Sequence, residues 1–167
     1  RIPLAALLVV AILAACGGET PREPIRLGGS TMGTTWIVQV VDPPPTVVEG
    51  DLERHLQALL DAVNGQMSTW DPDSELSRFN DAPAGEWFPV SAALVEVVDV
   101  ALELARETDG ALDVTVGPLV DLWGFGPGGE PRASLPDDAA VAEALARTGY
   151  EALSVRREPP ALRKSRP

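Results

Sequence analysis

The sequence is poor in the residues that build disulfides, zinc sites and nucleophile–histidine pairs. Its 167 residues include one Cys, one His and one Lys. These counts exclude a disulfide framework and a zinc site with several Cys and His ligands. They also leave His55 as the one imidazole available to a Ser-His-Asp or Cys-His site, and we expect it to be an ordinary surface residue. Lys and Arg number 13 against 25 Asp and Glu, which argues against a free-standing nucleic-acid binder.

The rest of the composition is that of a globular protein. Hydrophobic residues make up 45% and charged residues 23%, so wholesale disorder is excluded. The length allows one domain or part of one. The cations gather in the last stretch of the chain, which ends at Pro167, and the first residue is Arg1 rather than Met. We therefore expect a longer polypeptide at both ends.

The N-terminal segment is apolar. Ile2 to Ala15 is almost free of polar residues and follows Arg1. The run is shorter than the roughly 20 apolar residues of a membrane-spanning helix, and it fits the central region of a secretory signal peptide. It ends in Leu-Ala-Ala before Cys16 and two glycines, which resembles the lipobox of bacterial lipoproteins. The alternative is a plain signal peptide with an incidental Cys.

This pattern predicts three segments. Residues 1–15 are expected to be a lipoprotein signal peptide, 16–26 a tether after a lipidated Cys16, and 27–167 the domain itself. Acyl chains on the Cys would hold the domain at a membrane. The protein is thus expected to be exported and to work on the periplasmic side of the cell envelope.

Helical and strand patterns alternate along the mature chain. The β-branched and aromatic run at 34–41 predicts a strand. Apolar residues at helical spacing predict helices that begin after Asp51, Ser91 and Asp137. Residues 150–156 read as the start of another strand. Since no regular βαβ period is visible, the expected fold class is α+β.

Three loops carry unusual residues. Residues 28–34 combine glycines with hydroxyls, which suits a close ligand approach, although a simple β-turn is the alternative. Residues 67–80 place Trp70 in a polar loop, where it either stacks on an aromatic ligand or pins the loop. Residues 108–126 leave a helix through small residues, and Asp113 there can accept hydrogen bonds from a ligand.

Together and in this order, the three loops resemble the ApbE family of FAD:protein FMN transferases. The matching stretches read Thr-Met-Gly-Thr at 31–34, Met-Ser-Thr-Trp at 67–70 with Ser-Glu-Leu-Ser-Arg-Phe-Asn at 74–80, and the segment 110–126 that ends in Leu-Trp-Gly-Phe-Gly. The resemblance covers most of the chain from about Gly28 onward. It implies an α+β, ApbE-like flavin transferase domain that is truncated at its C-terminal side.

The resemblance also implies a reaction and its site. Such enzymes use Mg²⁺ to transfer FMN from FAD to a Thr or Ser hydroxyl of an acceptor protein. Typical acceptors are subunits of the sodium-translocating NADH:quinone oxidoreductase or of the RNF complex. By motif position, Met32 and Trp70 correspond to FAD contacts of the family. Ala111, Leu112 and Asp113 correspond to the segment that holds FAD through backbone and carboxylate.

One departure from the family pattern limits the expected activity. Family members continue with a segment that supplies a cofactor-binding Lys and part of the metal site, and Lys164 lacks the neighbours of that Lys. The Mg²⁺ ligands are therefore expected beyond residue 167, and residues 1–167 alone are expected to be inactive. No catalytic base is identified. The alternatives are a periplasmic lipoprotein that binds or hydrolyses FAD, and a non-enzymatic solute-binding lipoprotein.

Overall fold

The computed structural model describes residues 22–127 and 134–166. The predicted signal peptide and Cys16 lie outside the described residues. The chain divides into two units, Arg1–Leu56 and Gln57–Pro167, and each is described by itself. Helices and strands are both present and the strand pairs are antiparallel, which confirms the α+β class.

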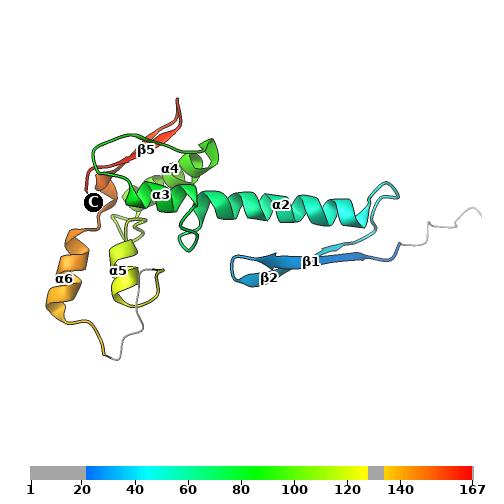
Figure 1. Ribbon diagram of the computed structural model, residues 1–167, viewed down its shortest axis with the longest axis horizontal. Helices are drawn as coiled ribbons and strands as arrows, with labels where there is room; N and C mark the ends of the chain where they lie inside the picture. The colour runs from blue at the N-terminus through cyan, green and yellow to red at the C-terminus, as the bar shows by residue number, and fades with distance from the viewer. Residues whose placement is uncertain (1–21, 128–133, 167) are drawn as a thin grey trace, which may run out of the picture. The chain divides into compact units, whose positions relative to one another are not determined.

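The first unit contains a β-hairpin. Strand β1 (Ile25–Thr31) pairs with β2 (Thr34–Val40), and Thr31 lies opposite Thr34 (Figure 1). The predicted strand at 34–41 is confirmed as β2. The prediction that residues 28–34 form a loop before this strand is wrong, because residues 28–31 belong to β1. Glycine suits position 28, because a Cβ there would lie 3.1 Å from the Trp36 carbonyl oxygen, closer than most Cβ contacts.

Helix α2 (Glu49–Met67) crosses the boundary between the two units. It begins two residues before the predicted cap at Asp51 and continues through Gly65, where the sequence predicted its end. A glycine inside a helix costs about 1 kcal/mol relative to alanine. The helical hydrogen bonding nonetheless continues past it, since the Ser68 N–H donates to the Asn64 carbonyl at 3.0 Å. His55 is exposed on α2, as expected.

The second unit is organised around helix α4 (Ala92–Glu107). Its N-cap is the predicted Ser91, whose side chain accepts from the Leu94 N–H at 3.2 Å. The buried face of α4 supplies most of the core, which contains Phe79, Leu94, Val95, Val98, Leu102 and Leu162. The helical periodicity of the sequence therefore identified the central element of this unit.

A three-stranded sheet contributes to this core. Its order is β3 (Phe88–Pro89), β5 (Ala161–Lys164), β4 (Leu153–Arg156). The predicted strand start at 150–152 is instead a 3₁₀ turn, and β4 follows it. Neither β3 nor β5 was predicted from the sequence. Strand β3 has only two residues, one of them Pro, and β5 has two apolar residues followed by two basic ones. Neither shows the alternation of apolar and polar residues that indicates a strand.

Three shorter helices complete the unit. Helix α3 (Glu75–Asp81) follows the polar loop at 68–74, and α5 (Gly117–Leu122) begins with Pro at its first turn. Helix α6 (Asp138–Ala146) is capped by the predicted Asp137, which accepts from the Ala140 N–H at 2.8 Å. Helices α5 and α6 contact one another (Figure 1). Within the described ranges, no helix combines the length and apolarity needed to cross a membrane.

Candidate functional site

The exit of α4 is shaped by two consecutive residues in the left-handed region. Asp109 has φ 52° and Gly110 has φ 79°, and together they turn the chain away from the helix axis. Thr108 secures the turn, since its hydroxyl donates to the Leu104 carbonyl at 2.8 Å and accepts from the Leu112 N–H at 3.2 Å. A Cβ on Gly110 would lie 3.5 Å from the Tyr150 ring, so the ring packs directly on this glycine.

The Asp113 carboxylate fixes the same loop from the other side. One of its oxygens accepts from the Thr115 N–H at 2.8 Å and from the Thr115 hydroxyl at 2.7 Å. The other accepts from the Tyr150 N–H at 3.1 Å. The Thr115 hydroxyl in turn accepts from the Gly149 N–H at 2.7 Å. We call these groups the Asp113 clamp: Asp113, Thr115 and the backbone N–H groups of Gly149 and Tyr150.

The clamp changes the role expected for Asp113. A carboxylate offers about four lone-pair positions, and three are used within the chain. The Asp113 carboxylate therefore mainly holds the loop against the turn that precedes β4. One position on the oxygen facing Tyr150 is left for an additional donor.

The neighbouring backbone is open to a ligand. Ala111 and Leu112 are exposed, and their N–H groups donate within the loop, to the Thr108 carbonyl and hydroxyl. Among the described residues, no hydrogen bond reaches the carbonyls of Ala111 and Leu112 or comes from the Asp113 N–H. These three groups can bind a planar polar ligand beside the apolar Leu112 side chain.

Trp70 is held on a loop whose polar groups are satisfied internally. The Ser68 hydroxyl accepts from the Trp70 and Asp71 N–H groups, both at 3.1 Å. The buried Ser74 donates to the Ser68 carbonyl at 2.6 Å and caps α3 by accepting from the Ser77 N–H at 3.0 Å. The Trp70 side chain itself is 69% exposed. The loop therefore does not bury its tryptophan, and the ring is available for stacking.

Met32 lies at the tip of the hairpin in the first unit. Met32 has φ 50° and Gly33 has φ 73°, the pattern of a type I′ turn, which favours Asn or Gly over Met at its first position. The turn is thus the β-turn that the sequence left as an alternative. A strained non-glycine residue at an exposed tip is a reason to look for a functional role, and Met32 is 54% exposed.

The structure brings only part of the predicted site together. Ala111, Leu112 and Asp113 form one continuous segment, and Trp70 belongs to the same unit. No hydrogen bond or ring contact among the described residues joins Trp70 to that segment. Met32 belongs to the other unit.

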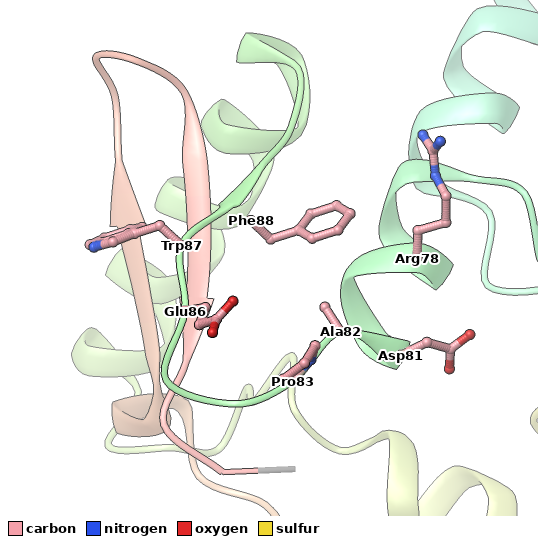
Figure 2. A pocket seen from close by; sticks show the side chains of 7 residues that line it. All are labelled: Arg78, Asp81, Ala82, Pro83, Glu86, Trp87 and Phe88. Atoms are coloured by element: carbon pink, nitrogen blue, oxygen red, sulfur yellow. The ribbon is translucent and has the colours of Figure 1, made fainter.

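The second unit contains a cavity of about 340 Å³ that was not predicted from the sequence. Figure 2 shows Ala82, Pro83 and Phe88 between the end of α3 and β3, with charged side chains around them. None of the predicted FAD contacts lines it. Its lining comes from the last turn of α3, the loop that follows α3, and Phe88 of β3. Because three successive parts of the chain meet there, no local sequence pattern predicted the cavity.

Lys164 has a structural role next to this region. Its ammonium donates to the Asn80 carbonyl in the last turn of α3 and lies 5.9 Å from the Phe79 ring centroid. Partial burial lowers the pKa of Lys164, and the nearby Asp81 carboxylate opposes that shift. A cation at a helix C-terminus is favourable, which explains this Lys without a cofactor role.

No metal site is found in the part of the chain that the structure describes. No group of three or more His, Cys, Asp or Glu side chains there is arranged to hold an ion.

We predict that Asp113→Asn loosens the loop, because the amide replaces one acceptor of the clamp with a donor. The free energy of unfolding should fall by about 1–3 kcal/mol, and the amide hydrogens of Gly149 and Tyr150 should exchange faster. Urea unfolding and hydrogen exchange of the full-length protein would measure both. Asp109→Asn is the matched control, since Asp109 is exposed and Asn accepts the left-handed region. Unchanged exchange at Gly149 and Tyr150 in Asp113→Asn would contradict the clamp.

Comparisons with known proteins point to one family. An FAD:protein FMN transferase from Vibrio cholerae serotype O1 is 45% identical over 152 residues, which are 91% of this chain and 45% of that protein. A Klebsiella pneumoniae protein of the same name is also 45% identical, over 86% of this chain and 42% of its own length. The chain spans about half the length of the curated relatives it matches.

Solved structures agree with these sequence matches. Flavin transferase ApbE from Vibrio cholerae superposes with a TM-score of 0.82 at 42% identity, over 89% of this chain and 47% of that one. The apo form of Pseudomonas stutzeri flavinyl transferase ApbE gives 0.79 at 32% identity, over 89% of this chain and 49% of that one. The model of the ApbE family matches residues 32–167, which hold Met32, Trp70 and the whole Asp113 clamp, and the chain therefore belongs to the ApbE family.

Proposed function

We propose that the full-length protein is an FAD:protein FMN transferase and that this chain supplies part of its FAD site. One observation carries the proposal: the match to the ApbE family extends over residues 32–167, which include Met32 of the hairpin tip, the Trp70 loop and the Asp113 clamp. Relatives with 40–45% identity over most of this chain carry that name.

The described residues would bind FAD through apolar surfaces and backbone groups. The exposed Trp70 ring offers a stacking surface, and the open carbonyls of Ala111 and Leu112 accept hydrogen bonds. The Asp113 clamp holds these carbonyls in place before FAD binds. Preorganisation of this kind reduces the entropy lost on binding.

The reaction replaces the phosphoanhydride bond of FAD with a phosphoester bond to the acceptor protein. A hydroxyl of the acceptor protein forms a bond to the FMN phosphorus, the pyrophosphate bond of FAD breaks, and AMP leaves with the bridging oxygen. The hydroxyl proton passes to a base that the described residues do not identify. We propose that the reaction requires Mg²⁺ bound by residues outside those described; when bound, the ion would neutralise pyrophosphate charge. The chain's own net charge of −12 cannot do so.

The transfer itself is directly testable. Full-length protein, FAD and Mg²⁺ would be incubated with an acceptor domain from the sodium-translocating NADH:quinone oxidoreductase or the RNF complex. We expect an FMN mass adduct on an acceptor Thr or Ser and one AMP released per adduct. Chelation of Mg²⁺ should abolish both. AMP release without an adduct would identify an FAD hydrolase instead, and neither product would contradict the proposed function.

Two variants test the predicted FAD contacts. Trp70→Ala should weaken FAD binding by about 1–3 kcal/mol, the scale of base–aromatic stacking. Met32→Asn should weaken FAD binding while leaving the free energy of unfolding unchanged or higher, because Asn suits the first position of a type I′ turn. Flavin fluorescence titration and urea unfolding would measure the two quantities.

Trp70→Phe provides the control for stacking, since it keeps a flat ring on the same loop. It should retain most of the FAD affinity. Wild-type affinity in Trp70→Ala with an intact fold would remove Trp70 from the site. Wild-type affinity in Met32→Asn would do the same for Met32.

We further propose that the protein is an exported lipoprotein, anchored at the periplasmic side of the envelope through Cys16. The support is the apolar run before a Cys that follows small residues and precedes two glycines. Several acyl chains on one Cys make attachment stable, at about 0.8 kcal/mol per buried CH₂.

Cys16→Ser should abolish this anchor. In cells that express the full-length protein, the wild type should incorporate labelled fatty acid and sediment with membranes, whereas the variant should not incorporate the label. The variant's FAD transfer should stay unchanged, since Cys16 is not one of the predicted FAD contacts. Equal labelling of both proteins would contradict lipidation at Cys16.

A further inference from the structure

One face of the three-stranded sheet carries a tryptophan between two arginines. Phe88 of β3 lies opposite Leu162 of β5, and both side chains belong to the core or pack against it. Successive side chains of a strand alternate between faces, so Trp87 and Arg163 point to the opposite face. Figure 2 shows the Trp87 side chain directed away from that of Phe88.

Arg156 of β4 completes this arrangement. Its guanidinium carbon and that of Arg163 each lie 4.8 Å from the centroid of the Trp87 ring. The two positive charges are therefore at most twice that distance apart. We call Trp87, Arg156 and Arg163 the arginine–tryptophan face. All three side chains are half-buried, so the ring and the charged groups have fixed positions but remain accessible.

No carboxylate neutralises this face within the described residues. Arg156 donates from its Nε to the Pro159 carbonyl at 3.0 Å, and neither Arg156 nor Arg163 forms an ion pair there. Arg157 on the same hairpin differs, since it pairs with Asp99, and this carboxylate raises the pKa of Arg157. Among the described arginines, Arg54 and Arg157 form ion pairs, and what distinguishes Arg156 and Arg163 is that both lie against one ring.

The chemistry of the face suits a carboxylate. Two like charges that share one ring repel each other, and an anion bound between them would relieve this repulsion. The ring holds the guanidinium groups by cation–π attraction. Stacked guanidinium groups keep their edges free for the paired N–H···O bonds that carboxylates accept.

We propose that the arginine–tryptophan face is the docking surface for an acidic segment of the acceptor protein. This inference rests on the proposed transferase function, which requires a second protein to approach the bound FAD. A chain with a net charge of −12 repels an acidic partner at long range. Short-range arginine–carboxylate contacts at one defined face would then determine where such a partner binds.

The small number of cations argues against an anionic membrane as the occupant. Binding of a protein to anionic lipid grows with the number of basic residues near the surface, and this face supplies two. A membrane-binding face also presents apolar side chains to the bilayer. The Trp87 ring instead has guanidinium groups beside it.

A peptide titration tests the face without catalysis. A fluorescein-labelled polyglutamate peptide would be titrated with full-length protein, and binding followed by fluorescence anisotropy. Arg163→Gln and Arg156→Gln should each weaken binding about tenfold, the loss of one charge-assisted contact. Arg163→Lys should give an intermediate result, because the ammonium keeps the charge but lacks the planar fork.

Arg157→Gln is the matched control. It removes the same charge from the same hairpin, but its partner is Asp99, so peptide affinity should stay close to that of the wild type. Equal affinity in the wild type, Arg156→Gln and Arg163→Gln would overturn the proposal. The proposal would also be overturned if the protein bound phosphatidylglycerol vesicles through Arg163 but did not bind the peptide. That result would identify the face as a membrane-binding surface.

Transfer kinetics connect the face to the acceptor. With saturating FAD, Arg163→Gln should raise the KM for the acceptor about tenfold and leave kcat and the KM for FAD unchanged. Wild-type transfer with an unaltered acceptor KM in Arg163→Gln would overturn the docking role. Failure of the wild type to transfer FMN would instead contradict the proposed function, and the peptide titration would still decide whether the face binds acidic segments.

Discussion

The carboxylate of Asp113 holds together two stretches that lie far apart in the sequence. It accepts from Thr115 and from the Tyr150 N–H, and so ties the exit of α4 to the turn before β4. Thr108 holds the other side of the loop, since it accepts from the Ala111 and Leu112 N–H groups. The positions of the open carbonyls at Ala111 and Leu112 therefore depend on Thr108 and on the Asp113 clamp together.

The predicted and observed roles of the polar residues differ in one consistent way. The sequence predicts Asp113 as a hydrogen-bond acceptor for a ligand and places Trp70 in a polar loop. In the structure, Ser68, Ser74 and Asp113 form hydrogen bonds within the chain. This outcome follows from physics, since a loop that must present backbone groups in a fixed geometry has to satisfy its remaining polar groups internally.

Sequence periodicity predicted the parts of the fold that local interactions determine. The apolar spacing of α4 and the caps at Ser91 and Asp137 depend on neighbours within a few residues, and all three are confirmed. Strand β1 was missed because Gly28 and Gly29 have low strand propensity, and its stability comes from pairing with β2. The Asp113 clamp was missed because its partner lies 37 residues away, a separation that leaves no local pattern.

The contacts of the basic residues near the C-terminus explain part of the uneven charge distribution along the chain. The cations near the C-terminus do not form one diffuse basic patch, since each has a different environment. Arg157 is paired with Asp99 and Lys164 binds the end of α3, so both are explained by the fold alone. Among the described residues, Arg156 donates to the Pro159 carbonyl, and Arg156 and Arg163 both lie against the Trp87 ring. The cation–π contacts hold the two guanidinium groups beside one ring, and the proposed docking of an acidic segment depends on that arrangement.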